Sequence, residues 1–239
     1  MFESKKRIPP NQRLIVALDV DTPREAMELV EALGESVTFY KMGLQLFMAG
    51  GYFELMEELK KAHKEIFVDL KFFDVPQTVG SAVRRLEDKG ATFVSVHGND
   101  AILKAAVNAK EDLKILAVTV LTSLDEGDLN DLGFQCNVEQ LVLSRAKRAL
   151  QIGCDGIVSS GLEASAIRNE LGEKLLIVTP GIRPVANCRV DDQKRIMTPK
   201  DAFKAGADYI VMGRPIRTAT DPRAKAEEVQ QVIRDVFED

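Results

Sequence analysis

The sequence predicts an α/β protein that folds as a single (β/α)8 TIM barrel. Short apolar runs rich in β-branched residues recur eight times, longer amphipathic stretches separate them, and no break in composition divides the 239 residues. Strands that alternate with helices form a parallel sheet, and eight such repeats close naturally into a barrel. We therefore expect one domain over residues 1–239, with residues 1–12 as a polar N-terminal arm.

The first half of the chain supplies four strands, expected at 14–18, 37–40, 66–70 and 93–96. Amphipathic periodicity predicts the helices between them at 24–33, 52–62 and 79–89. At the start of the first helix, Thr22 can cap, Pro23 fits the first turn and Glu25 can complete a capping box. Gly90 follows the third helix and suits the left-handed conformation that ends a helix.

The second half repeats this alternation, with strands expected at 115–120, 156–158, 175–178 and 209–212 and helices at 138–152, 163–171 and 199–205. Thr198 and Pro199 again form a helix start, and Gly206 a helix stop. The connections 121–137 and 180–197 are longer than the scaffold requires. Both follow the carboxyl ends of strands, where barrel enzymes build their sites, so we expect lids or binding loops there.

Composition excludes several classes of function. The net charge of −5 gives no basic surface for nucleic acid, and no apolar run approaches the roughly 20 residues of a membrane span. The first residues lack the apolar stretch of a secretory signal. The cysteines are odd in number and widely spaced, at Cys136, Cys154 and Cys188, which favours a reducing cytoplasm over a disulfide framework.

The histidines are limited to His63 and His97. They leave no His/Cys cluster for a metal and disfavour histidine-based catalysis. We expect His97 to be a satisfied structural residue, and Met42, Met48 and Met56 to pack in the core. Chemistry is therefore expected from Asp, Lys, Arg and the backbone.

Charged residues occur where the first three predicted strands end. Asp19 follows the first strand, Lys41 follows the second, and Asp69 and Lys71 end the third. Because side chains alternate along a strand, Asp69 and Lys71 face the barrel axis if Leu70 faces the helices. Buried charges are costly unless they are paired. The pattern favours a functional cluster at the mouth of the barrel over a structural ion-pair network.

The segment Asp69-Leu70-Lys71-Phe72-Phe73-Asp74, with Pro76 and Thr78 after it, resembles the DxKxxD signature of the orotidine 5′-monophosphate decarboxylase family, bacterial type. The resemblance covers nearly the whole chain, through Leu18-Asp19, Tyr40-Lys41-Met42-Gly43, Val120-Leu121-Thr122-Ser123, Thr179-Pro180-Gly181-Ile182-Arg183-Pro184, Asp192-Gln193-Lys194-Arg195-Ile196 and Val211-Met212-Gly213-Arg214-Pro215. The chain departs from many members at Phe73 and Gln77, where they carry His and Asn, so the contacts of that loop are expected to differ.

The resemblance implies a cofactor-free carboxy-lyase that converts orotidine 5′-monophosphate to uridine 5′-monophosphate, the last step of de novo pyrimidine nucleotide synthesis. It implies Asp69 and Lys71 as the catalytic pair, with Lys71 as proton donor to the C6 carbanion and Lys41 completing the charged relay. It also implies a homodimer in which Asp74 reaches the partner's site and Thr78 follows it.

The resemblance further assigns substrate contacts: Asp19 and Lys41 to the ribose hydroxyls, Thr122 to the nucleotide, and Arg183, Gln193, Gly213 and Arg214 to the phosphate. The residues themselves support the last two assignments. Arg214 directly follows the eighth strand, near which barrels commonly bind phosphate, and arginine grips phosphate as a fork. Gly213 lets a backbone N–H approach closely.

Two other functions remain open. The 3-keto-gulonate phosphate decarboxylases and hexulose phosphate synthases share DxKxxD but use Mg²⁺ to stabilise an enediolate; the Tyr40-Lys41 motif and the loop with Arg183 and Gln193 favour the nucleotide enzyme. A catalytically silent phosphate-binding barrel is the second alternative. The intact Asp69-to-Asp74 motif argues against it, because a silent barrel has no need to bury these charges.

Overall fold

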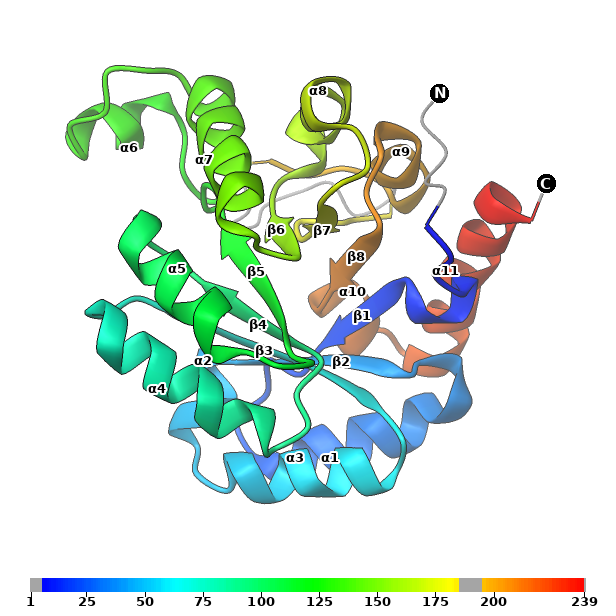
Figure 1. The fold of residues 1–239 in the computed structure, drawn as a ribbon. Helices are drawn as coiled ribbons and strands as arrows, with labels where there is room; N and C mark the ends of the chain where they lie inside the picture. The colour runs from blue at the N-terminus through cyan, green and yellow to red at the C-terminus, as the bar shows by residue number, and fades with distance from the viewer. Residues whose placement is uncertain (1–5, 185–194, 239) are drawn as a thin grey trace.

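The computed structural model describes residues 6–184 and 195–238, which form a closed parallel barrel with its strands in chain order (Figure 1). The eighth strand pairs with the first, so the sheet has no free edge. The strands are β1 (Leu14–Ala17), β2 (Phe39–Gly43), β3 (Glu65–Phe72), β4 (Phe93–Val96), β5 (Lys114–Val118), β6 (Gly156–Val158), β7 (Leu176–Thr179) and β8 (Tyr209–Met212). The predicted (β/α)8 barrel is confirmed.

Helices surround the barrel and connect its strands (Figure 1). They are α1 (Pro23–Leu33), α2 (Leu44–Met48), α3 (Tyr52–Lys61), α4 (Pro76–Glu87), α5 (Asp100–Ala109), α6 (Glu126–Asp131), α7 (Val138–Ile152), α8 (Gly161–Leu171), α9 (Pro199–Ala205), α10 (Arg214–Arg217) and α11 (Pro222–Phe237), with 3₁₀ turns at Pro10–Gln12 and Gly34–Ser36. Thr22 caps α1 as predicted, because its Oγ1 accepts from Glu25 N at 3.2 Å. The predicted capping box is not completed, because the Glu25 carboxylate accepts from the Asp21 backbone N–H at 3.0 Å. None of the helices in the described ranges is long and apolar enough to cross a membrane.

Two strands differ from the sequence prediction in a way that matters for the charges. The sequence places the second strand at 37–40, whereas β2 extends to Gly43 and so contains Lys41. The third strand is expected at 66–70, whereas β3 continues to Phe72 and contains Lys71 as well as Asp69. Hydrophobic patterning marks only the apolar part of a strand, and these two strands keep their pairing into a polar end.

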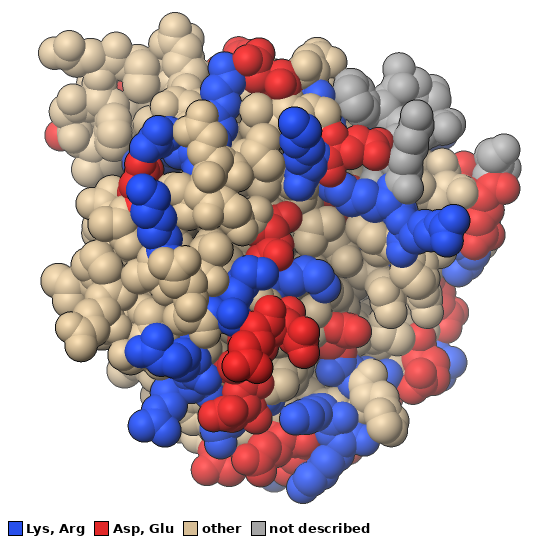
Figure 2. All heavy atoms as spheres, viewed as in Figure 1, with Lys and Arg blue, Asp and Glu red and all other residues tan. Residues whose placement is uncertain are grey.

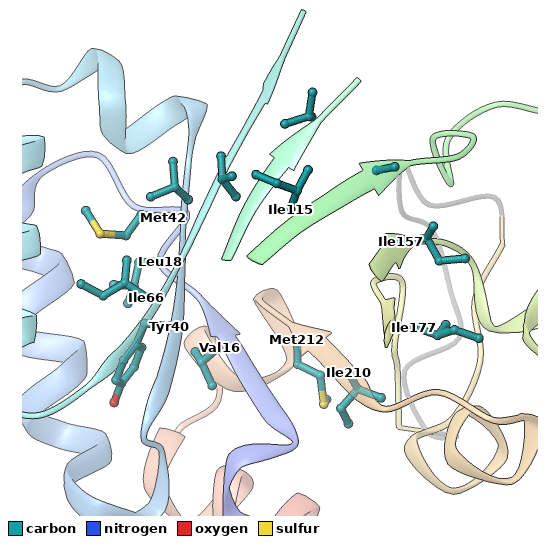
Figure 3. Packing of buried hydrophobic residues seen from close by; sticks show 14 of the residues in the cluster. Val16, Leu18, Tyr40, Met42, Ile66, Ile115, Ile157, Ile177, Ile210 and Met212 are labelled. Atoms are coloured by element: carbon teal, nitrogen blue, oxygen red, sulfur yellow. The ribbon is translucent and has the colours of Figure 1, made fainter. Parts of the chain in front are cut away.

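The strands separate two apolar layers. One layer packs between the outer faces of the strands and the helices, and it includes Val16, Tyr40, Ile66 and Ile210 (Figure 3). The other fills the barrel interior, where the rings of Phe39, Phe93 and Tyr209 meet with centroids 5.0 to 5.9 Å apart.

Inward-facing positions change from apolar to polar along the same strands. Phe39 precedes Lys41 by two residues on β2, and Phe67 precedes Asp69 by two on β3. Since side chains two apart share a face, the aromatic layer lies directly beneath the charged residues. The packed interior therefore forms the floor of the barrel mouth.

The opposite, amino-terminal end of the barrel holds a buried ion network around Asp208, which is fully buried. Its Oδ2 atom accepts from Lys6 Nζ at 2.6 Å, Arg168 Nη2 at 2.7 Å and the Ile177 backbone N–H at 2.9 Å. Arg13 donates to the Asp208 carbonyl at 3.2 Å. We call these four side chains, Asp208, Lys6, Arg168 and Arg13, the Asp208 network.

One expectation about the core is wrong. Met42 and Met56 are fully buried, but Met48 is 75% exposed. Met48 ends the short helix α2, which leaves the barrel directly after β2, so its side chain lies at the rim rather than in the interior. On the face shown in Figure 2, acidic and basic side chains are interspersed without an extended basic area, as expected for a chain of net charge −5.

Candidate active site

A cavity of about 430 Å³ opens among the residues that follow the carboxyl ends of the strands. Eight of the residues singled out from the sequence line it together: Asp19, Lys41, Asp69, Lys71, Thr122, Arg183, Gly213 and Arg214. Apolar residues from the barrel interior, among them Phe67, Val118 and Val158, line it as well. The cavity thus combines a charged wall with an apolar floor, as small-molecule sites commonly do.

The charged wall is a continuous chain of opposite charges. Lys41 Nζ lies 3.0 Å from Asp19 Oδ1 and 3.5 Å from Asp69 Oδ2. Lys71 Nζ lies 3.0 Å from Asp69 Oδ1. The order Asp19–Lys41–Asp69–Lys71 alternates in sign, so each charge contacts its opposite and the cluster is neutral overall.

The inner pair of this chain is shielded from solvent, while the outer pair reaches the cavity. The side chains of Lys41 and Asp69 are 12% and 13% exposed, against 42% for Asp19 and 39% for Lys71. Burial alone would lower the pKa of Lys41, but Asp69 and Asp19 outweigh it and raise that pKa. Burial opposes ionisation of Asp69, yet Lys41 and Lys71 hold its pKa below the ordinary value. Both residues therefore stay charged at neutral pH.

The backbone of Lys71 adopts a left-handed conformation, with φ of +49°. This conformation is unfavourable for a side chain with a Cβ and persists only where the surroundings enforce it. The pairing of β3 with β4 shifts register between Val68 and Phe72, so β3 bulges at this point. The alternation expected from the sequence is therefore interrupted, although Leu70 still packs against the helix-side core.

Ser95 holds both catalytic candidates and was not apparent from the sequence. Its hydroxyl donates to Asp69 Oδ1 at 2.8 Å and accepts from the Lys71 backbone N–H at 2.9 Å. Ser95 is fully buried, two residues after Phe93 on β4. The period of two along β4 predicts that it faces inward, and this is the signal that could have identified it.

Gly43 leaves room for the ion pair at the end of β2. A Cβ atom at this position would lie 3.0 Å from Lys41 Nζ and 3.1 Å from Asp19 Oδ1. Any side chain would therefore push against both partners. The φ of Gly43 is −103°, so the requirement is for space rather than for a backbone conformation.

Arginines that follow β7 and β8 also line the cavity. Arg183 is buried, and its Nη1 donates to the Ile182 carbonyl at 2.9 Å. Arg214 opens α10 directly after β8, and Arg217 lies one turn later. Arg217 was not singled out from the sequence, although its spacing of three from Arg214 puts both on one side of a helix. Three guanidinium groups give this part of the cavity the charge that an anionic ligand requires.

Two predicted site residues lie elsewhere, and a third is not among the residues that the structure describes. Asp74 and Thr78 are exposed and are not among the residues that line the cavity. Asp74 Oδ1 instead accepts from the Val75 backbone N–H at 2.6 Å. Gln193 lies outside the described residues, as does Cys188.

His97 lies outside the cavity, packed edge-to-face against Phe73 with ring centroids 5.4 Å apart. Burial, Arg145 and Lys71 together lower its pKa. Its buried Nδ1 atom has no hydrogen-bond partner among the described residues, so the histidine is less completely satisfied than expected.

The acidic residues of the cavity are poorly suited to a divalent cation. Asp19 and Asp69 both contact Lys41, and Asp69 also accepts from Lys71 and Ser95. A metal ion would have to displace ammonium groups from these carboxylates. Within the described ranges, no group of three or more His, Cys, Asp or Glu residues is placed to hold a metal.

Comparison with known proteins gives one consistent result. The family model described as "Orotidine 5′-phosphate decarboxylase / HUMPS family" matches residues 12–229. Orotidine 5′-phosphate decarboxylase of Methylococcus capsulatus is 61% identical over 236 residues, which cover 99% of this chain and 98% of that protein. The protein of the same name from Nitrobacter winogradskyi is 48% identical over 227 residues, covering 94% of this chain and 92% of its own.

The solved structures agree. The crystal structure of orotidine 5′-phosphate decarboxylase from Lactobacillus acidophilus superposes with a TM-score of 0.81 at 34% identity, covering 93% of this chain and 99% of that one. The family and the carboxy-lyase class predicted from the motifs are confirmed by these likenesses. The chain belongs to the orotidine 5′-phosphate decarboxylase / HUMPS family.

Proposed function

We propose that this chain decarboxylates orotidine 5′-monophosphate to uridine 5′-monophosphate, the last step of de novo pyrimidine nucleotide synthesis, without a cofactor. The observation that carries the proposal is the contact between Asp69 and Lys71 at the wall of the cavity, with Lys41 completing the alternating chain. Relatives named as orotidine 5′-phosphate decarboxylases match nearly the full length of the chain.

The reaction breaks the bond between C6 of the pyrimidine ring and the carboxylate carbon. The electron pair of that bond stays on C6 as a carbanion in the ring plane, outside the π system. The Lys71 ammonium stabilises this charge and then gives its proton to C6, which leaves an amine that is reprotonated from solvent. Preorganised charge of this kind is often the largest contribution to catalysis. Asp69 holds Lys71 in position at 3.0 Å.

The rest of the cavity accounts for the nucleotide. Asp19 and Lys41 bind the ribose hydroxyls, and Thr122 contacts the nucleotide from the loop after β5. Arg183, Gly213 and Arg214 bind the phosphate. The same role is proposed for Gln193, which is not among the described residues. Binding energy from the phosphate is used to position the distant ring. We add Arg217 to the phosphate-binding residues as a weaker contributor.

A spectrophotometric assay with orotidine 5′-monophosphate, run with and without EDTA, tests the proposal. We expect release of CO₂ and formation of uridine 5′-monophosphate at the same rate in both conditions. Turnover that EDTA abolishes would instead favour the Mg²⁺-dependent sugar-phosphate chemistry found among enzymes that share DxKxxD. Tight nucleotide binding without CO₂ release would favour the silent barrel.

We further propose a homodimer with shared sites. Large apolar side chains are exposed in the segments that follow β2 and β3: Leu44, Phe47 and Met48 on α2, and Phe73 and Val75 on either side of Asp74. Exposed apolar residues that form a contiguous surface mark interaction sites, and we propose that these five belong to one. With this surface against a second copy, Asp74 and Thr78 would complete the partner's site, which explains why neither lines the cavity of its own chain.

Mixing two inactive proteins tests this arrangement. Lys71→Ala removes the proton donor from its own site, and Asp74→Asn removes the group supplied to the partner. We expect the mixture to regain activity, because a heterodimer contains one site with both groups intact. Heterodimers that form but stay inactive would contradict the shared site.

We place the protein in the cytoplasm, which the unpaired Cys136 and Cys154 support.

A further inference from the structure

Arg195 bridges two walls of the cavity without lining it. Its Nη1 donates to Glu163 Oε1 at 2.5 Å, and its Nη2 donates to the backbone carbonyls of Val120 at 3.3 Å and Leu121 at 3.1 Å. These partners come from α8 and from the loop after β5. The Arg195 side chain is 10% exposed and that of Glu163 is 8% exposed. The guanidinium is therefore a buried connection between segments 32 to 75 residues apart in the chain.

On one side, Arg195 belongs to the segment that returns from the β7 loop to the barrel. Two residues later, Met197 N donates to the Gly181 carbonyl at 3.3 Å, and the Met197 carbonyl accepts from Arg183 N at 2.9 Å. Ile182 pairs with Met197 in a parallel bridge. The backbone that carries Arg183 is thus fixed to the backbone that carries Arg195.

On the other side, Arg195 fixes the start of the β5 loop. Val120, Leu121 and Thr122 all line the cavity. The Leu121 carbonyl also accepts from Leu124 N at 3.0 Å, which closes a turn around Thr122. The two carbonyls that Arg195 binds therefore belong to the backbone immediately before Thr122 and fix the position of Thr122 at the cavity wall.

If either member of the Arg195–Glu163 pair is removed, few other groups are available to bond the remaining one. Glu163 Oε2 and Arg195 Nε are buried and have no hydrogen-bond partner in the described part of the chain. Burial raises the pKa of Glu163, against the opposing effect of Arg195. Removing either side chain leaves the other buried without its charge partner, which is strongly unfavourable.

From these contacts we propose that Arg195 is a positioning residue, which holds the Thr122 loop and the Arg183 segment at a fixed separation across the cavity. The inference rests on the proposed function, because that separation sets how the ring and the phosphate of one nucleotide are held together. Loss of the guanidinium frees the β5 loop to shift. A displacement of about 1 Å at a distance from the chemistry can reduce the rate by about 100-fold.

A second buried arginine provides a matched control. Arg168 also bonds a carboxylate and backbone carbonyls, with Nη2 2.7 Å from Asp208 Oδ2 and with Nε and Nη1 each 2.8 Å from a carbonyl. It lies in the Asp208 network, at the far end of the barrel from the cavity. Both Arg→Met substitutions remove a buried guanidinium, but only Arg195→Met removes a contact to the cavity wall.

The experiment compares the wild type, Arg195→Met, Arg195→Lys, Glu163→Gln and Arg168→Met at a temperature where each is folded by circular dichroism. Where Arg168→Met does not fold, Lys6→Met replaces it, since Lys6 binds the same carboxylate. The measurements are kcat and KM for orotidine 5′-monophosphate and the dissociation constant of uridine 5′-monophosphate.

For Arg195→Met we expect kcat/KM to fall by about 10- to 100-fold and nucleotide affinity to weaken. Arg195→Lys recovers part of the loss, because an ammonium can still bind Glu163 or one carbonyl. Glu163→Gln loses less than Arg195→Met, since the carbonyl contacts remain. The control loses stability but keeps its kcat/KM.

Two results overturn the proposal: wild-type kcat/KM and affinity in folded Arg195→Met, or an equal loss of kcat/KM in the control. Wild-type turnover in the same assay separates this inference from the proposed function. A wild type that releases no CO₂ contradicts the function. An active wild type with an equally active Arg195→Met contradicts the positioning role alone.

Discussion

The two ends of the barrel each bury opposite charges, but they surround those charges differently. In the Asp208 network, one carboxylate oxygen accepts from two cationic side chains and a backbone N–H, and none of the four side chains lines the 430 Å³ cavity. At the mouth, Asp69 is shared between Lys41 and Lys71, and the outermost ammonium faces the cavity from a left-handed backbone. Buried charge alone does not identify a functional site. Charge that is paired yet directed at a cavity does.

Substitution at the amino-terminal end should give the largest loss of stability. Asp208→Asn leaves Lys6 and Arg168 without their charge partner, and we expect the free energy of unfolding to fall by about 3–5 kcal/mol. In the protein that remains folded, kcat/KM should stay within about twofold of the wild type, because the Asp208 network and the cavity share no residue and distant sites act independently. Urea denaturation combined with the orotidine 5′-monophosphate assay measures both quantities. A large loss of kcat/KM in folded protein would break the contrast between the two ends.

Adding a single methyl group at the mouth should lower activity and leave stability nearly unchanged, the reverse of the effect expected for Asp208→Asn. Gly43→Ala places a Cβ about 3.0 Å from Lys41 Nζ, so the Lys41–Asp19 pair must move. We expect kcat/KM to fall by about tenfold, which corresponds to about 1.4 kcal/mol, while thermal stability changes little. Gly127→Ala, at an exposed position of α6, serves as the control for activity and should leave kcat/KM unchanged. Unchanged activity in Gly43→Ala would show that the spacing of this pair is not needed.

The mouth should also make the protein sensitive to acid. The pKa of Asp69 is lowered on folding, so its contribution to stability is fully present above the unfolded value of about 3.9 and is lost as pH falls through the folded value. Stability measured by urea denaturation between about pH 5 and 3 should therefore fall less steeply in Asp69→Asn than in the wild type. Asp131→Asn, at an exposed position, is the control. Equal slopes in wild type and Asp69→Asn would contradict the lowered pKa.

The smallest expected effect isolates the backbone of Lys71. Lys71→Ala and Lys71→Gly remove the same ammonium, but only glycine relieves the φ of +49°. We expect Lys71→Gly to be more stable than Lys71→Ala by about 1 kcal/mol, with both inactive. Chemical denaturation of the two variants measures the difference. Equal stability would mean that the left-handed backbone carries no strain.

Much of the fold was accessible from the sequence, because it depends on local patterns. All eight predicted strands are present, in chain order around the barrel. Since parallel strands share one carboxyl edge, placing Asp19, Lys41 and Asp69 at three strand ends was enough to predict that they meet. The same reasoning placed Arg214 after β8, on the wall of the same cavity.

What the sequence did not reveal depends on contacts between distant residues. Lys6 and Asp208 are 202 residues apart, and no periodicity links them. The left-handed backbone of Lys71 follows from the bulge between β3 and β4, which is a property of the pairing and not of either strand. Arg195 belongs to the same class, because its partners lie on two other elements.

The most direct test of the account compares turnover and stability in wild type and Lys71→Ala. The wild type should release CO₂ from orotidine 5′-monophosphate. Lys71→Ala should lose at least about 1,000-fold in kcat while it remains folded and still binds uridine 5′-monophosphate. Near-normal turnover in folded Lys71→Ala would contradict the claim that the cavity-facing ammonium at the barrel mouth performs the chemistry.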